Sequence, residues 1–126
     1  MNIDHLTLLL SSLERGMPYY EHLLPLLGFV KKRDHVWSNS NGFFLQFSEA
    51  ASGSRPYERY GAGMNHVGFS AETPQQVHAI RESMHSAGFE VPEILHLSGA
   101  VALFMTDLDA IRFEITSYPP GSDPND

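Results

Sequence analysis

Two short stretches of sequence, Ile3-Asp4-His5-Leu6-Thr7-Leu8 and Met64-Asn65-His66-Val67-Gly68-Phe69, decide the fold of this chain. Each predicts a short apolar strand with a histidine near its start, and the two histidines lie 61 residues apart (66 − 5). A helical stretch follows each strand and ends in Gly-Phe, at Gly28-Phe29 and at Gly88-Phe89. The chain therefore contains one structural unit written twice.

Each half closes with a turn and an aromatic-rich strand, over Asn41–Phe47 and over Asp109–Ile115. Gln46 in the first closing strand matches Glu114 in the second, at an offset of 68 (114 − 46). The larger offset means that the first half has a shorter inner segment. We therefore expect the order strand-helix-strand-strand-strand, twice.

The length of 126 residues predicts a single domain. Each half has only about 60 residues, which is marginal for an independent core, so we expect the halves to share one. The first module covers about residues 1–60 and the second about 61–118. Residues 119–126, rich in Pro and Asp, are expected to fray.

The first half predicts one helix and four strands. Ser11-Ser12 can cap the helix, which should end near Leu24 because Pro25 follows. Ser40-Asn41-Gly42 supplies the turn before the last strand. The strands are expected over residues 2–10, 28–33, 35–39 and 43–48. Residues 49–63 form a long connection, and connections of this length in small domains are often functional.

The second half carries clearer helix signals. Thr73 is the expected N-cap, Pro74 fits the first turn, and Gln76 stands at the capping-box position. Gly88 ends the helix. The buried stripe of this helix is expected to contain Val77, Ile80, Met84 and Ala87. Strands are expected over residues 89–96, 100–106 and 111–118.

Composition excludes several classes of function. A formal charge of −7 disfavours nucleic-acid binding, and the one basic run, Lys31-Lys32-Arg33, is interpreted as a solvated strand end. The chain has no cysteine, so disulfides and thiolate chemistry are excluded. No apolar segment approaches the length of a membrane span, and the N-terminus lacks a signal pattern. We expect a cytoplasmic protein without nucleic-acid or membrane partners.

These features together resemble the vicinal oxygen chelate superfamily: glyoxalase I, extradiol dioxygenases, fosfomycin-resistance proteins and bleomycin-binding proteins. The resemblance covers residues 2–118 and rests on the order and spacing of His5, Tyr19-Tyr20, Asn65–Phe69 and Asp107–Glu114. It implies an α+β fold in which two βαβββ modules form a curved eight-stranded mixed sheet around a metal-binding cavity. Family members are usually dimers, so a homodimer is expected.

Four residues stand at the positions where the family holds its metal: His5, Gln46, His66 and Glu114. Strand alternation puts polar or small side chains on the face of each candidate and apolar ones on the opposite face. The set of two imidazoles, one amide and one carboxylate fits one divalent ion such as Zn, Ni, Fe, Mn or Co. Many glyoxalase-type sites have Glu where this chain has Gln46, so a divalent ion here would leave a net site charge near +1.

Other residues can belong to the site. Arg112, two before Glu114, should share its face and either binds a substrate carboxylate or pairs with a nearby acid. His35 and His96, on inner strands, can line the cavity. An apolar substrate pocket can be formed by Trp37, Phe44, Tyr57, Tyr60 and Phe104, although aromatics in so small a domain more often belong to the core.

The resemblance implies a glyoxalase-I-like lyase or isomerase. It would bind a small substrate through two adjacent oxygens and react through an enediolate or alkoxide, with Glu114 as the catalytic base because Gln46 cannot take a proton. A second reading is a dioxygenase that uses only His5, His66 and Glu114. Fosfomycin-type addition is weaker, because Ser98–Ala102 is apolar where that group carries a charged loop. A third reading is a non-catalytic antibiotic-binding and resistance protein, although those proteins lack the metal ligands.

Overall fold

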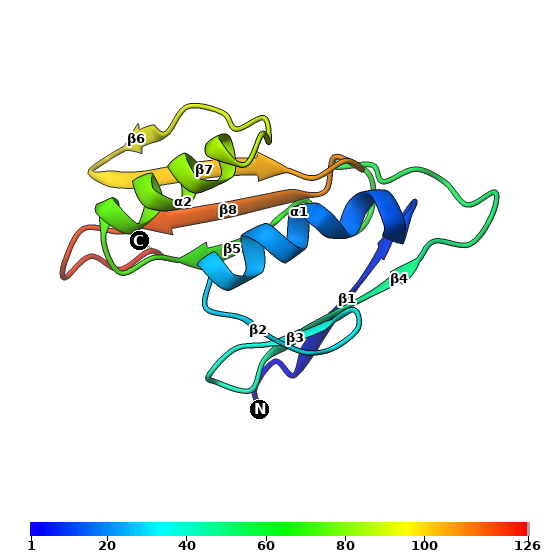
Figure 1. Cartoon of the computed structure of the whole chain (residues 1–126). Coiled ribbons are helices and arrows are strands. Elements are labelled where there is room, and N and C mark those ends of the chain that lie inside the picture. The colour runs from blue at the N-terminus through cyan, green and yellow to red at the C-terminus, as the bar shows by residue number, and fades with distance from the viewer. Residues whose placement is uncertain (126) are drawn as a thin grey trace. The chain divides into compact units, whose positions relative to one another are not determined.

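The computed structural model describes residues 1–125, so only the last residue of the expected tail lies outside it. The chain divides into two compact units, Met1–Tyr57 and Glu58–Asp126. Within the described residues, each unit has one helix and one four-stranded sheet (Figure 1). The predicted order of strand, helix and three strands, repeated twice, is confirmed.

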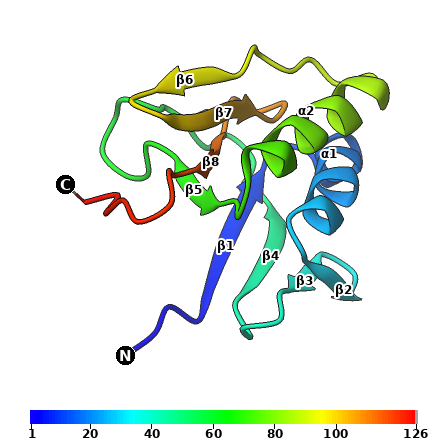
Figure 2. The same ribbon diagram turned by 90° about the vertical axis from the view of Figure 1, so that its left-hand side faces the viewer.

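The first unit begins with strand β1 and closes with the strand that lies beside it. Its sheet has the order β1-β4-β3-β2, and β1 runs parallel to β4, while the other neighbours are antiparallel. Figure 2 shows β1 and β4 side by side. The elements are β1 (His5–Leu10), α1 (Leu13–Leu26), β2 (Val30–Arg33), β3 (Val36–Ser38) and β4 (Phe44–Glu49).

The second unit repeats this topology. Its sheet has the order β5-β8-β7-β6, with β5 parallel to β8 and the remaining pairs antiparallel. Its elements are β5 (Val67–Ser70), α2 (Pro74–Ser86), β6 (Leu95–Leu97), β7 (Ala100–Thr106) and β8 (Arg112–Ser117). The α+β class is confirmed, and hydrogen bonding divides the eight strands of residues 1–125 into two mixed four-stranded sheets.

Both helices end in the same hydrogen-bonded turn. The amide of Phe29 donates to the carbonyl of Leu24, and the amide of Phe89 donates to the carbonyl of Met84. Gly28 and Gly88 precede these phenylalanines with φ of 88° and 93°, a conformation that glycine adopts without a Cβ penalty. The repeated Gly-Phe pair is therefore a repeated helix stop.

Some predicted boundaries are wrong for local reasons. Helix α1 continues through Pro25 and ends at Leu26. Pro25 has no amide hydrogen to donate to the carbonyl of Glu21, but Glu21 is exposed, so water can bond to that carbonyl instead. Ala87 is exposed, because it is the C-cap residue and lies beyond the last turn of α2. Gln76 does not bond to the amide of the N-cap Thr73, as a capping box requires. Its side chain accepts instead from the amide of Glu72, one residue earlier.

The strand expected over residues 89–96 is mostly loop, and only Leu95–Leu97 is a strand. Pro92 has no amide hydrogen to donate to a ladder. The guanidinium of Arg81 on α2 donates to the carbonyl of Pro92 at 2.8 Å and pairs with Glu93 at 3.2 Å. These contacts replace the missing strand pairing.

In each unit the helix covers one face of the sheet and leaves the other face for polar side chains. Tyr20 on α1 packs against Phe47 on β4, with ring centroids 4.5 Å apart. Phe113 and Ile115 on β8 are buried on the corresponding face of the second sheet, and α2 packs on β7 and β8. None of the helices among the described residues has the length and apolar character that a membrane crossing requires.

Candidate metal and substrate site

Strand register places the candidate ligands at equivalent positions in the two modules. Thr7 lies opposite Gln46 in the β1–β4 ladder, and Gly68 lies opposite Glu114 in the β5–β8 ladder. His5 comes two residues before Thr7, as His66 does before Gly68. The offset of 61 therefore joins equivalent positions of β1 and β5, and the offset of 68 joins equivalent positions of β4 and β8.

In the second unit, the side chains of His66 and Glu114 meet. Nε2 of His66 lies 2.9 Å from Oε2 of Glu114, and these side chains are 34% and 20% exposed. In the β5–β8 ladder Glu114 pairs with Gly68, two residues after His66, and the glycine has no side chain between the carboxylate and the imidazole. The contact therefore runs diagonally across the ladder, over the glycine.

Asn65 determines which nitrogen of His66 carries the proton. The amide nitrogen Nδ2 of Asn65 donates to the carbonyl of Arg59 at 3.0 Å, which turns Oδ1 of Asn65 toward Nδ1 of His66 at 2.7 Å. Because that oxygen only accepts, Nδ1 of His66 must donate, and the neutral ring keeps its lone pair on Nε2. A lone pair then faces a carboxylate oxygen, and only a cation or an added proton between them makes the contact favourable.

Glu114 is held in the same way on its other oxygen. The hydroxyl of Thr116, two residues along β8, donates to Oε1 of Glu114 at 2.6 Å. Oε2 is left for the contact with His66. A cavity of about 150 Å³ adjoins this carboxylate, and it is lined by Gly68, Phe69, Ser70, Glu114, Thr116 and Tyr118.

The first unit orients its candidates with equivalent contacts. Nδ1 of His5 donates to Oδ2 of Asp4 at 2.6 Å, and the ring stacks on Phe44 with centroids 4.8 Å apart. The amide nitrogen of Gln46 donates to the hydroxyl of Thr7 at 2.6 Å. These contacts leave Nε2 of His5 and Oε1 of Gln46 as the atoms with free lone pairs for a ligand.

The donor atoms of the second unit fit a divalent ion. Two ligands at right angles, each about 2.1 Å from one ion, stand about 3 Å apart. The 2.9 Å between Nε2 of His66 and Oε2 of Glu114 matches this right-angled, octahedral spacing and is also an ordinary ion-pair distance. Among residues 1–125, no group of three or more His, Cys, Asp or Glu side chains stands close enough to hold a metal ion.

Three of the expected substrate residues lie on the polar face of their own sheet. The guanidinium of Arg112 stacks over Phe104 at 4.1 Å, and His66 meets the same ring edge to face at 6.2 Å. Phe44 lines a cavity of about 270 Å³ in the first unit together with Gln46. Arg112, Phe104 and Phe44 therefore each lie beside a candidate ligand.

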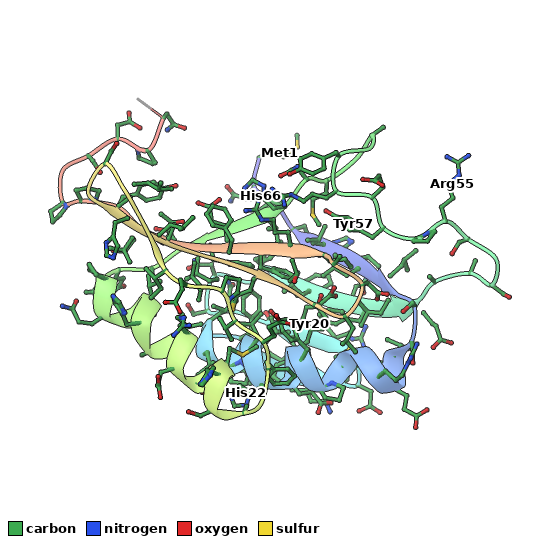
Figure 3. All side chains as sticks on the ribbon, turned by 90° about the horizontal axis from the view of Figure 1, so that it is seen from above. Met1, Tyr20, His22, Arg55, Tyr57 and His66 are labelled. Atoms are coloured by element: carbon green, nitrogen blue, oxygen red, sulfur yellow. The ribbon has the colours of Figure 1, made fainter. Side chains whose placement is uncertain are left out.

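The other expected residues lie elsewhere. Trp37 is buried opposite Leu45 on the helix-covered face. It therefore belongs to the core, which was the alternative to a place in the substrate pocket. Tyr60 is 78% exposed and stacks with Arg59 at 4.7 Å. Tyr57 is half-buried and comes from the connecting segment, as does Arg55, which projects outward from it (Figure 3).

The two additional histidines do not join the polar faces. His96 lies opposite Val101, and Val101 lies opposite Ser117, so His96 stands on the face away from Glu114. His35 sits in the turn between β2 and β3 with φ of 65°. The residues that sequence reasoning missed are Asp4, Thr7, Asn65 and Thr116, which orient the candidates. The dipeptides Asp4-His5 and Asn65-His66 are the signal that could have found two of them.

Solved structures similar to this chain share its fold. A candidate glyoxalase from Bacillus halodurans is 21% identical over 92% of this chain and 95% of its own, with a TM-score of 0.75. A glyoxylase/bleomycin resistance protein/dioxygenase domain from Frankia sp. EAN1pec is 20% identical over 94% and 98%, also with a TM-score of 0.75. The fosfomycin resistance protein FosX from Listeria monocytogenes is 14% identical over 95% of each chain, with a TM-score of 0.70.

Among proteins of curated function, none matches this chain significantly. The family model of the Glyoxalase/Bleomycin resistance protein/Dioxygenase superfamily matches residues 2–115, which is most of the chain. The repeated module, its strand order and this match agree with one another. The chain belongs to this superfamily, the vicinal oxygen chelate superfamily.

Proposed function

We propose that this protein is a divalent-metal-dependent enzyme of the glyoxalase-I-like type that acts on a small substrate with two adjacent oxygens. The observation that carries the proposal is the pair formed by His66 and Glu114. Asn65 keeps the lone pair of His66 on Nε2, and this atom faces a carboxylate oxygen at 2.9 Å. A divalent cation satisfies both donors at once.

The proposed ligands are His66 and Glu114 from the second unit and His5 and Gln46 from the first. When bound, a divalent ion such as Zn, Ni, Fe, Mn or Co would polarise the two substrate oxygens and stabilise negative charge on them. The histidines would bind through Nε2, because Nδ1 of each donates to the side chain of the preceding residue. Gln46 would bind through Oε1, because its amide nitrogen donates to Thr7.

Glu114 is the proposed base. It is the one carboxylate among the four candidates, and Gln46 cannot accept a proton at physiological pH. The hydroxyl of Thr116 holds Oε1 of Glu114, so Oε2, once released from the ion, is the atom that would take a proton from the substrate carbon and return it. Proton transfer between neighbouring carbons, as in a lyase or isomerase, is the reaction class that this arrangement supports.

The test is metal stoichiometry of protein purified without a metal-affinity tag. We expect about one divalent ion per chain for the parent and almost none for His66→Ala and Glu114→Ala. Adding the correct ion back to metal-free parent protein should restore its activity. His96→Ala is the matched control, because it removes a histidine from the opposite face of the same sheet. If His66→Ala or Glu114→Ala retains metal as tightly as the parent, the site is wrongly assigned.

A facial-triad dioxygenase is the second candidate. It would use His5, His66 and Glu114, with Gln46 outside the coordination sphere. The neutral amide of Gln46 favours it, because an amide oxygen is a weaker ligand for a divalent ion than the carboxylate that many glyoxalase-type sites hold at this position. Substitutions at Gln46 distinguish the two candidates.

A further inference from the structure

A β-bulge in strand β2 rearranges the one basic run of the chain. Lys31 lies opposite Trp37 and Arg33 lies opposite Val36, so two steps along β2 match a single step along β3. Lys32 is the extra residue of this bulge. Bulges redirect side chains that strict alternation would point to the other face.

The bulge puts Arg33 on the face of Gln46. Val36 is the direct partner of Gln46 in the β3–β4 ladder, whereas Trp37 is the partner of Leu45 on the helix-covered face. Without the bulge, Arg33 would share the face of Lys31 and Trp37. With it, Lys32 and Arg33 both line the cavity of about 270 Å³ that contains Gln46.

This cavity combines charge with an apolar wall. Its full lining is Lys32, Arg33, Val36, Ser38, Phe44 and Gln46. Lys31, one residue away, is tied instead to Asp34 at 3.5 Å. The chain has a net charge of −7, but the wall of this cavity carries two positive charges. Lys31, Lys32 and Arg33 are all exposed, as expected for a solvated strand end, and the bulge adds that Lys32 and Arg33 also line this cavity.

We propose that Lys32 and Arg33 form a binding subsite for the anionic group, carboxylate or phosphonate, of a small molecule whose apolar part packs on Phe44 and Val36. A cavity slightly below the ~300 Å³ lower range of ligand sites suits a small acid or the acidic end of a larger molecule. Arg33 offers a planar fork for two oxygens, and Lys32 adds a point charge. The subsite adjoins Gln46, so its role in positioning a substrate rests on the proposed function. Its affinity for an acid is independent of that function.

The experiment uses metal-free full-length protein and three related compounds: phenylacetate, phenylphosphonate and neutral phenylacetamide. Binding is followed by NMR, through the side-chain amide of Gln46 and the backbone amide of Ser38. We expect at least one of the two anions to bind about tenfold more tightly than the amide, a difference of about 1.4 kcal/mol. The preferred anion identifies the class of acid, and salt should weaken its binding.

Lys31→Ala is the matched control for Lys32→Ala, because both remove one lysine from neighbouring positions. We expect Lys32→Ala and Arg33→Ala each to weaken anion binding about fivefold or more, and Lys31→Ala to change it less than about twofold. An equal loss in Lys31→Ala and Lys32→Ala would show a general charge effect and overturn the subsite. Equal binding of phenylacetamide and both anions would overturn it as well.

Repeating the titrations with metal-loaded protein separates this proposal from the proposed function. Anion binding that persists without metal supports the subsite even if metal stoichiometry fails for the parent protein. Conversely, a protein that binds one metal per chain but shows no anion preference retains the metal site and loses the subsite. The two failures are therefore distinguishable.

Discussion

Asn65 and His66 form a fixed pair: Oδ1 of Asn65 lies 2.7 Å from Nδ1 of His66, and the carbonyl of Arg59 holds the Asn65 amide in the orientation that this contact requires. Asp4 and His5 repeat the arrangement at 2.6 Å with a carboxylate in place of the amide. Both modules thus set the tautomer of their histidine through the residue that precedes it. The difference in charge between Asp4 and Asn65 is a difference between the two halves of one proposed site.

Replacing Asn65 with leucine should weaken metal binding without removing a ligand. Leucine has a similar size but no acceptor for Nδ1 of His66, so the ring can place its proton on Nε2 and lose the donor lone pair. Loss of such an orienting partner typically reduces metal affinity by about 10–100-fold. Competition titration against a metal-binding dye measures the change.

Asn65→Asp is the control for this substitution. It restores an acceptor at the same place and reproduces the Asp4-His5 pair of the first module. We expect affinity within about tenfold of the parent, well above that of Asn65→Leu. Parental affinity in Asn65→Leu would mean that His66 does not bind metal through Nε2.

The repeat and the ligand positions could be predicted because strand alternation and offsets are properties of the sequence itself. Thr7 pairs with Gln46 as Gly68 pairs with Glu114, so the offsets of 61 and 68 both join equivalent positions of the two modules. Burial of Leu45 and Phe47 and exposure of Ser48 follow the predicted alternation. These features depend on period two alone.

Sequence could not place residues whose position depends on an irregularity. The bulge at Lys32 breaks the period, so no alternation argument predicts that Arg33 faces Gln46. Likewise, Arg81 reaches from α2 to the carbonyl of Pro92, in the loop that replaces the start of the expected strand. Both features arise from contacts between segments, which local patterns do not contain.

The glycine that ends α2 should be needed for stability. Gly88 has φ of 93°, and a Cβ added there meets no heavy atom within 4 Å, so the cost of Gly88→Ala is backbone strain alone. We expect a loss of about 1–2 kcal/mol in the free energy of unfolding. Gly88→Asn should lose less, because Asn tolerates this conformation. Urea unfolding measures both, and an unchanged midpoint for Gly88→Ala would contradict the turn.

We also predict a homodimer. β1 and β2 are the edge strands of the first sheet, and each carries an exposed apolar side chain, Leu9 at 55% and Val30 at 60%. Edge strands with apolar side chains are usually covered in the native assembly. Light scattering at tens of micromolar should give twice the chain mass of 14.1 kDa. A stable monomer under these conditions would refute the dimer.

Gln46 separates the two proposed chemistries. If Oε1 of Gln46 binds the metal, Gln46→Leu should lower affinity about tenfold or more, which corresponds to at least about 1.4 kcal/mol. Gln46→Glu should raise affinity, because a second carboxylate reduces the net charge of a divalent site from about +1 toward zero. The hydroxyl of Thr7 can donate to the new carboxylate where it now accepts from the amide, so the side chain keeps its partner.

Thr7→Val tests whether this partner matters. Without the hydroxyl, the amide of Gln46 is free to rotate, and metal affinity should fall by less than in Gln46→Leu but measurably. In a facial-triad dioxygenase Gln46 stays outside the coordination sphere, so all three variants should bind metal like the parent. Competition titrations on the parent and the three variants, with the optical spectrum of the cobalt-substituted protein as a second readout, decide between them. Parental affinity and an unchanged spectrum in Gln46→Leu would remove Gln46 from the ligand set and favour oxygen chemistry on His5, His66 and Glu114.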